Sequence, residues 1–279
     1  MRHSLPLTRS CLALGLTLVL TPAVQAALIF EDGFNYSTGN LAGNGLWTGA
    51  SANIQVGSLS LTVPGLADTA SPGGDVTVTS GVSAGTTKAN FTTTAVTGGS
   101  LYYAFLAVCT TLPTANNYLT SLNATGGGPS GSADPLSVYV GAPTGDSTHF
   151  KIGVRHTSTG SGATYTTANS TFTVGSTHLF VVEYTFGGVG GTVSLFVDPT
   201  PGGSQPTPDV TVAGVSGSDT ANLQVVGFKA QSAASAGNWT FDTVRIGDTW
   251  ADVTPVPEPS SLALMGLAVG MLLLRRPRC

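Results

Sequence analysis

The central part of the chain, from about residue 28 to 255, is a series of short runs in which apolar and polar residues alternate. A period of two is typical of strands with one buried face, and the Gly, Pro, Asn and Ser clusters between the runs are typical of turns. The run HLFVVEYTF is more continuously apolar, which predicts a central position in a sheet. The expected strands are residues 58–63, 75–80, 88–94, 101–108, 136–141, 150–156, 178–186, 192–198, 223–230 and 239–247.

No helical periodicity is visible between the two ends of the chain. Ten or more strands without helices predict an all-β, antiparallel, two-sheet jelly-roll sandwich, with no helix inside it. The proline-rich residues 198–209 and the glycine-rich residues 125–135 are expected to be long loops rather than domain boundaries, because strands continue after them. One domain is therefore expected over residues 27–255.

The N-terminal 26 residues have the three parts of a secretory signal peptide. Arg2 and Arg9 are basic, residues 11–20 are apolar, and Val24-Gln25-Ala26 has small residues at the two recognised positions. We expect a signal helix that signal peptidase removes by cutting between Ala26 and Ala27. The apolar run is too short for a helix that spans a membrane, which needs about 20 residues.

The C-terminal residues 256–279 combine Pro257-Glu258-Pro259, an apolar stretch at 262–274 and the basic cluster Arg275, Arg276 and Arg278. An apolar stretch followed directly by arginines predicts a transmembrane helix whose basic end stays in the cytoplasm, which leaves the body outside. On this pattern alone, the tail could be a permanent single-pass anchor.

The order of these three parts resembles the PEP-CTERM sorting signal of Gram-negative bacteria. The resemblance implies that the tail holds the exported protein transiently in the inner membrane. An exosortase, which is a membrane transpeptidase, would then cut near Pro257-Glu258-Pro259. The product would reach the cell surface or the exopolysaccharide matrix.

The charge of the chain narrows its possible partners. Charged residues make up 9% of the chain, and the segment from Glu31 to Glu258 holds five basic and 14 acidic residues, a net charge of −9. An acidic body without clustered Lys and Arg argues against nucleic acid as a partner.

Cys109 would be the one cysteine left in the processed body, so no internal disulfide is expected there. Its apolar neighbours predict a buried, unreactive thiol.

The body also resembles concanavalin A-like, laminin-G-like jelly rolls. The opening LIFEDGFNYSTGNLAGNGLW, the middle STHLFVVEYTFGG and the closing NWTFDTVRIGDTWADVTP carry this resemblance. It implies that the first and last strands are neighbours, so that Phe34 and Trp47 pack near Trp239 and Phe241. It also implies a structural calcium ion that Asp32 and Asp242 could help to hold. Calcium needs six to eight oxygen ligands, and solvated or turn-capping aspartates are the alternative.

No pattern of catalytic residues stands out, and we expect a protein that is not an enzyme. Jelly-roll glucanases use a Glu-x-Asp-x-Glu triplet, which is absent, and the adjacent Glu31 and Asp32 would face opposite sides of a strand. His149, His156 and His178 are not spaced as a metal pair and are expected at the surface, near strand ends. The expected function is a non-catalytic surface or matrix protein. A glycan-binding module that uses Tyr and Trp is the main alternative, and a polysaccharide lyase or hydrolase is a further one.

Overall fold

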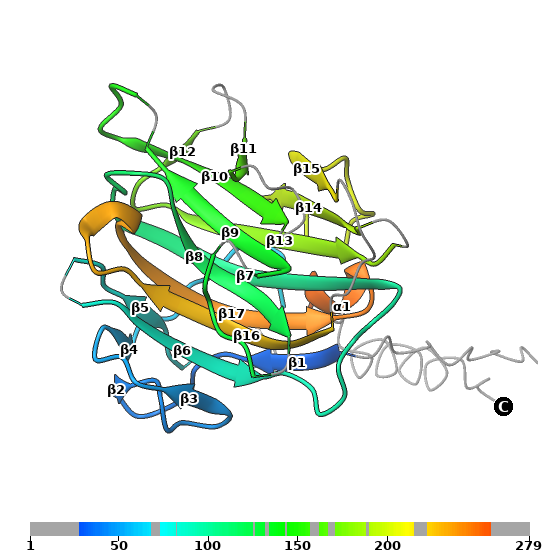
Figure 1. Cartoon of the computed structure of the whole chain (residues 1–279), viewed down its shortest axis with the longest axis horizontal. Coiled ribbons are helices and arrows are strands. Elements are labelled where there is room, and N and C mark those ends of the chain that lie inside the picture. Colours follow the sequence, from blue (N-terminus) through cyan, green and yellow to red (C-terminus); the bar gives the residue numbers. More distant parts are fainter. Residues whose placement is uncertain are drawn as a thin grey trace, which may run out of the picture.

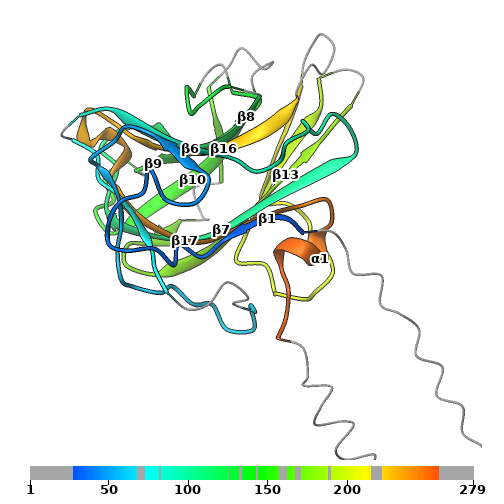
Figure 2. The same cartoon turned by 90° about the horizontal axis from the view of Figure 1, so that it is seen from below.

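The computed structural model describes residues 28–67, 73–81, 83–124, 126–131, 134–142, 144–156, 162–166, 171–187, 190–214 and 222–257. These residues form two antiparallel sheets that pack face to face (Figures 1 and 2). We call the nine-stranded sheet sheet A and the eight-stranded sheet sheet B. The predicted all-β sandwich is confirmed.

Sheet A contains the first and the last strand of the body. Its order is β15 (Val210–Ala213), β14 (Thr192–Val197), β13 (Thr177–Thr185), β7 (Ser100–Thr111), β17 (Asn238–Gly247), β5 (Val76–Val78), β4 (Ile54–Val56) and β2 (Gly39–Asn40). Strand β1 (Leu28–Asp32) also pairs with β17, with Asp32 opposite Val244, as the predicted contact of first and last strands requires. Strand β13 lies inside the sheet, between β14 and β7.

Sheet B covers one side of this layer. Its order is β11 (Thr164–Tyr165), β10 (His149–His156), β9 (Leu136–Gly141), β8 (Asn117–Ala124), β16 (Leu223–Ala230), β6 (Gly85–Asn90) and β3 (Trp47–Gly49), and β12 (Phe172–Thr173) pairs with β10. In β10, Phe150, Ile152 and Val154 are buried in the core, so the side chains between them point to the outer face.

Aromatic side chains fill the space between the sheets. Trp47 stacks on Phe228 with ring centroids 5.3 Å apart, and Trp239 meets Phe150 edge-on at 4.9 Å. Trp239 and Phe241 are both fully buried, so both point inward. Burial of these large aromatic side chains removes much apolar surface from water, and it is therefore a major contribution to the stability of the sandwich.

A bulge in β17 keeps its apolar residues on the core side. The register with β7 shifts between Asp242 and Arg245, and Thr243 has a φ of 50°. Trp239 and Phe241 precede the bulge, and Val244 and Ile246 follow it at an odd spacing, yet all belong to the core cluster. An unbroken strand would have turned the second pair to the opposite face.

The prediction of a strand at residues 58–63 is wrong. This segment belongs to a stretch, residues 58–67, that crosses the outer face of sheet A. Leu61, Val63 and Leu66 pack on the outer face, which accounts for the alternation. The backbone N–H groups of Leu59 and Leu61 donate to the carboxylates of Asp75 and Asp242, at 2.8 and 2.7 Å, rather than to a neighbouring strand.

The expectation of a body without helix also needs correction. Between β16 and β17 there is a 3₁₀ turn, η2 (Ala234–Ala236), and after β17 a one-turn helix, α1 (Trp250–Val253). A capping box between Thr249 and Asp252 starts α1. The helix buries Trp250 against Phe196 on the side of sheet A that faces away from sheet B (Figure 2).

Several predictions concern residues that the structure does not describe. These are the signal peptide, its cleavage between Ala26 and Ala27, Glu258 and Pro259, the apolar stretch at 262–274, and the basic cluster Arg275, Arg276 and Arg278. They stay predictions. Pro257, the last described residue, is exposed. Within the described residues, none of the helices has the length and apolar character needed to cross a membrane.

Candidate functional site

The two glutamates within the described residues are each held by protein groups. Glu31 forms an ion pair with Arg245, which is 1% exposed, and the guanidinium also donates to the backbone oxygen of Ala67. Glu183 accepts hydrogen bonds on Oε1 from the hydroxyls of Ser100 and Tyr102, at 2.9 and 3.0 Å. Burial, with a smaller contribution from Glu183, raises the pKa of Tyr102 to about 12. Both carboxylates therefore stabilise strand pairs of sheet A.

The two aspartates predicted to share a calcium ion lie in separate networks. Asp32 faces the core, where it accepts hydrogen bonds from the Trp47 indole at 2.7 Å and from the Tyr36 hydroxyl at 2.8 Å. Asp242 accepts from the backbone N–H groups of Leu61 and Thr243, on the outer face. Within the described residues, no three or more His, Cys, Asp or Glu side chains are grouped to hold a metal ion. The geometry gives the calcium hypothesis no support.

Asp32 and Glu31 do face opposite sides of β1, as their adjacent positions predicted. Asp32 reaches the core residue Trp47, whereas Glu31 reaches Arg245 and the outer segment at Ala67. The pair is therefore not arranged as the two carboxyls of a retaining glycosidase, which need a common cleft.

Asp248 and Asp252 are the carboxyl groups that interact with each other. Burial raises the pKa of Asp248, and a hydrogen bond to Asp252 adds to the shift. Asp252 in turn accepts hydrogen bonds from the backbone N–H and the hydroxyl of Thr249, at 3.0 and 2.7 Å. Because these bonds form the cap of α1, Asp252 has a structural role, and Asp248 is its exposed neighbour.

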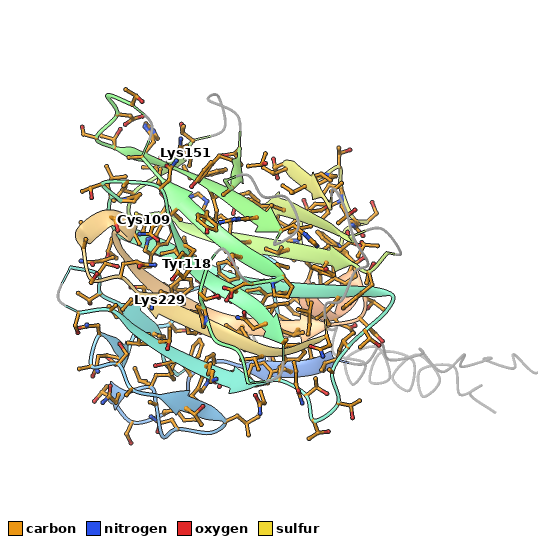
Figure 3. All side chains as sticks on the ribbon, viewed as in Figure 1. Cys109, Tyr118, Lys151 and Lys229 are labelled. Atoms are coloured by element: carbon orange, nitrogen blue, oxygen red, sulfur yellow. The ribbon has the colours of Figure 1, made fainter. Side chains whose placement is uncertain are left out.

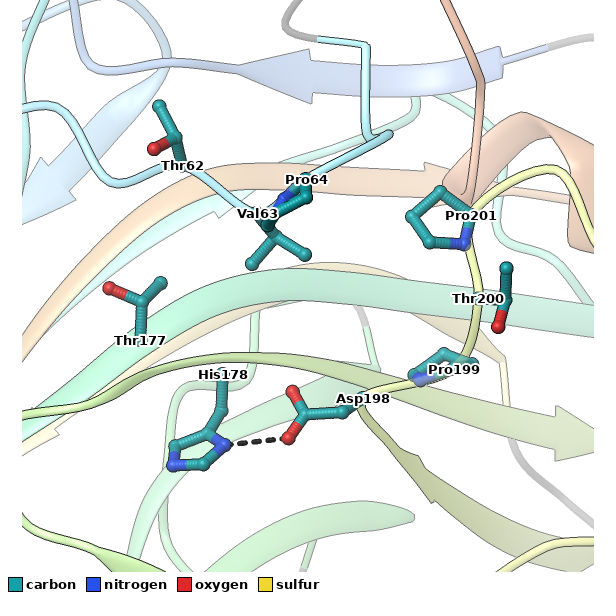
Figure 4. A pocket seen from close by; sticks show the side chains of 9 residues that line it. All are labelled: Thr62, Val63, Pro64, Thr177, His178, Asp198, Pro199, Thr200 and Pro201. Carbon is teal, nitrogen blue, oxygen red and sulfur yellow. Dashed lines mark hydrogen bonds and ion pairs between the residues drawn. The ribbon is translucent and has the colours of Figure 1, made fainter.

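An open pocket of about 390 Å³ lies beside the 58–67 segment, between residues 62–64, 177–178 and 198–201 (Figure 4). In it, His178 Nδ1 lies 2.7 Å from the carboxylate of Asp198. The imidazole packs against Phe150, Phe172 and Phe180, and its buried Nε2 has no hydrogen-bond partner among the described residues. A Ser-His-Asp triad needs a nucleophile at this atom, and no described residue supplies one.

The histidines were expected at the surface near strand ends, but two of them are buried. His156 is 4% exposed, stacks on Tyr184 and lies 2.9 Å from its hydroxyl, and His178 is 9% exposed. His149 is paired with Asp146, whose pKa is lowered to about 2 mainly by a hydrogen bond from the backbone of Thr148. Cys109 is buried, as predicted, and burial raises the pKa of its thiol to about 12.

The outer face of sheet B carries a different set of side chains, which we call the basic face. Lys88 on β6, Lys151 and Arg155 on β10, and Lys229 on β16 are its cations. Each one stands between two buried residues of its strand, for example Lys229 between Phe228 and Ala230. Because side chains alternate along a strand, all four cations point away from the core.

Three tyrosines lie among these cations. Tyr118 is paired with Tyr139 on the neighbouring strand, and Gly153 is paired with both Tyr139 and Tyr165, so the tyrosines form a row across four strands. The rings of Tyr118 and Tyr139 are 5.8 Å apart. Figure 3 labels Lys151, Tyr118 and Lys229, which lie on β10, β8 and β16 of sheet B.

Contacts fix some of these side chains. The ammonium of Lys151 lies 4.7 Å from the ring centroid of Tyr165, and the Lys88 ammonium donates to the backbone oxygens of Gly126 and Gly127, at 2.8 and 2.7 Å. The same loop covers the sheet at Gly227, where a Cβ atom would come within 2.6 Å of Pro129. At Gly131 a Cβ atom would come within 2.6 Å of the Tyr118 ring, so the loop also lies against one end of the half-buried tyrosine row.

The alternation in FKIGVRH could have placed Lys151 and Arg155 on one outward face, but the sequence analysis did not single them out. The register that brings Tyr118, Tyr139 and Tyr165 into one row comes from three separate strand pairings. No local pattern in the sequence specifies these pairings.

Comparison with known proteins identifies the tail. Residues 255–278 match the model of the PEP-CTERM protein-sorting motif. The chain carries this motif, as its tail residues predicted, and the motif implies an exported protein that is sorted by an exosortase. No curated protein matches the chain.

Solved structures resemble the body. The globular domain of T. cruzi calreticulin is 14% identical, with a TM-score of 0.50 over 89% of this chain and 98% of that one. An endo-β-1,4-glucuronan lyase from the fungus Trichoderma reesei is 11% identical, with a TM-score of 0.47 over 82% and 99% of the two chains. An endo-1,3-β-glucanase from Streptomyces sioyaensis is 11% identical, with a TM-score of 0.47 over 81% and 97%. At these identities the likeness concerns the jelly-roll fold alone.

Proposed function

We propose that this protein is a non-catalytic component of the cell surface or of the extracellular polysaccharide matrix. Export would take it across the inner membrane, the tail would anchor it there for a time, and an exosortase would release it to the outside. The match of residues 255–278 to the sorting motif supports this route.

One observation carries the non-catalytic part of the proposal. The two described glutamates and Asp252 at α1 are all engaged by groups that hold strands or a helix cap together. Glycoside hydrolysis needs two carboxyl groups that flank a substrate, one of them free to give or take a proton. A matrix protein needs no such pair.

Sorting is tested with the epitope-tagged full chain in a host that has an exosortase. Replacement of Pro257, Glu258 and Pro259 by alanine should leave the protein exported but uncut in the inner membrane. Replacement of Pro206 and Pro208, which lie in the other proline-rich segment of the body, is the matched control and should leave processing unchanged. If the variant with the altered motif were cut and released like the original, the proposed route would be wrong.

Catalysis is tested with the polysaccharide matrix of the same host. We expect no new reducing ends and no unsaturated sugar products when the matrix is incubated with the full chain. Turnover that disappears in Glu183→Gln or Asp248→Asn would contradict the non-catalytic proposal and favour a lyase or hydrolase.

A second function, glycan binding, is favoured by the basic face. Its tyrosines are half-buried, and their rings lie in one row between side chains that can donate hydrogen bonds. Aromatic rings combined with polar groups are a common means of holding small polar ligands. This function is compatible with a place in the matrix.

A further inference from the structure

The charged residues of the two sheets are separated by sign. The strands of sheet A contain Glu31, Asp32, Glu183, Asp242 and one cation, Arg245. The strands of sheet B contain no Asp or Glu in the described residues, and their cations are Lys88, Lys151, Arg155 and Lys229. With Arg245 buried against Glu31, the basic face holds every other Lys and Arg of the segment from Glu31 to Glu258, whose net charge is −9.

Within the described residues, none of these cations forms an ion pair with a carboxylate. The ion pairs among the described residues involve Arg245, His149 and His178, and none of them includes a cation of the basic face. Among the acidic side chains beside this face, Asp134 is 1% exposed and accepts hydrogen bonds from Ser130, Gly131 and Ser137, and Asp146 is paired with His149 at the start of β10. Both carboxylates are thus engaged by other groups, and cations that outnumber the carboxylates around them attract anions.

The basic face also has hydrogen-bonding capacity that the described residues do not use. Arg155 has five N–H donors, but its Nη1 only approaches the Tyr139 hydroxyl, at 3.5 Å, and its buried Nε has no partner within the described residues. The Nη end of the guanidinium can therefore donate to the oxygen acceptors of a ligand without first breaking a short hydrogen bond.

We propose that the basic face binds an acidic polysaccharide. Lys151, Arg155 and Lys229 would meet its carboxylate or sulfate groups, and the rings of Tyr118 and Tyr139 would lie against sugar rings. This inference deepens the proposed function, because it names the component of the matrix that the protein would hold.

Charge density favours a sugar polymer over nucleic acid. Duplex DNA carries one charge per about 1.7 Å, and proteins that bind it tightly neutralise roughly six to ten phosphates. The basic face offers four cations, one of which is held by loop carbonyls, and the rest of the body is acidic. An acidic polysaccharide has more widely spaced charges and hydroxyl-rich rings between them, which matches cations interleaved with tyrosines.

The test is the migration of the full chain, in a nonionic detergent, through native gels that contain a polysaccharide. Sodium polygalacturonate supplies carboxylates, dextran sulfate supplies sulfates, laminarin is neutral, and duplex DNA is tested in solution as a competitor. We expect retardation by at least one acidic polymer, at least tenfold weaker in laminarin, and weaker binding at higher salt.

The variant that tests the basic face combines Lys151→Gln, Arg155→Gln and Lys229→Gln and should lose at least tenfold in affinity. Its matched control combines Thr62→Glu, Thr200→Glu and Thr211→Glu, which changes the net charge equally at exposed positions on the sheet A side and should lose less than about twofold. Melting temperatures check that both variants fold.

Three outcomes would overturn the inference: no binding to either acidic polymer, equal loss in the variant and its control, or tighter binding to DNA than to the polysaccharides. None of these would affect the sorting experiment, which follows the cleavage of the tail. Failure of this inference can therefore be distinguished from failure of the proposed function.

Discussion

The outer faces of the two sheets differ in what covers them. On sheet A, the 58–67 segment and α1 bury a second apolar cluster that includes Tyr102, Leu106 and Phe196. On sheet B, the outer face carries half-buried tyrosines and cations. One face is therefore part of the folded interior, and the other is available for contact with a partner.

The sequence of each strand reflects this difference. β7, which is covered on both faces, reads LYYAFLAV without a polar break, whereas β10 alternates apolar residues with Lys151, Gly153 and Arg155. A continuous apolar run thus indicates a covered strand, and strict alternation indicates an open one. The difference between the covered outer face of sheet A and the open outer face of sheet B can be tested by equivalent substitutions on each face.

The largest expected effect is on the covered face. Phe196 is 1% exposed and contacts Trp250, so Phe196→Ala should lower the free energy of unfolding by about 3–5 kcal/mol. On the open face, Tyr139→Ala should cost about 1 kcal/mol, because the ring is half-buried and its contacts are few. Chemical denaturation of both variants measures the difference. Equal losses would mean that the two outer faces are not distinct.

Removing one cation from each face should show the same difference in stability, with smaller losses. Arg245→Ala leaves the Glu31 carboxylate, which is 19% exposed, without its partner, and should cost about 3 kcal/mol. Lys229→Ala removes an unpaired cation of the basic face and should change stability by no more than about 0.5 kcal/mol. Urea unfolding at constant salt measures the free energy of unfolding of both variants. A Lys229 effect as large as that of Arg245 would show that the basic face is structural.

The anchoring of the 58–67 segment can be weakened directly. Asp242→Asn puts an amide where the carboxylate accepts the Leu61 N–H, and should cost about 1–3 kcal/mol. Asp209→Asn is the matched control, because Asp209 also accepts a backbone N–H, that of Val197, but at an exposed site. Limited proteolysis should cut near residues 58–67 faster in Asp242→Asn alone. Identical cleavage in both variants would rule out this role for Asp242.

The last expected effect depends on pH and concerns Cys109, in the core that both sheets share. Its thiol has a pKa of about 12 in the folded protein, against an ordinary value of 9.0. The folded state therefore favours the neutral thiol, so this contribution to stability is present below pH 9 and is lost as the pH rises from 9 to 12. Cys109→Ala should lose less stability across this window than the original chain, in parallel melts. A steeper loss in the variant would contradict the assigned burial.

The sequence predicted the features that depend on local periodicity. Residues 136–141 and 223–230 are strands with the expected bounds, and the contact between the first and last strands is confirmed. Strand β8 was missed because a bulge between Tyr118 and Thr120 interrupts its alternation. The 58–63 segment was taken for a strand because its alternation serves packing on the outer face rather than pairing.

Features that depend on the register of distant strands could not be predicted. The bulge at Thr243 and the tyrosine row require knowledge of which strands are neighbours and of how they align. The same holds for the charges: the sequence shows an acidic body, and only the topology shows that its unpaired cations share one face. The sorting tail was predictable because its motif is contiguous in the sequence.

The central claim is that the basic face, and not the covered side of the molecule, contacts an acidic polysaccharide. The lysines of the chain are Lys88, Lys151 and Lys229, all on this face, so acetylation of amines reports on it directly. Labelling of the exposed carboxyl groups of Asp198 and Asp209 reports on the sheet A side.

Mass spectrometry would follow both labels in the full chain, with and without an acidic polymer that retards it. The account predicts that the polymer slows acetylation of Lys151 and Lys229 at least fivefold and leaves carboxyl labelling unchanged. Unchanged lysine labelling in the complex, or protection of Asp198 and Asp209 instead, would contradict it.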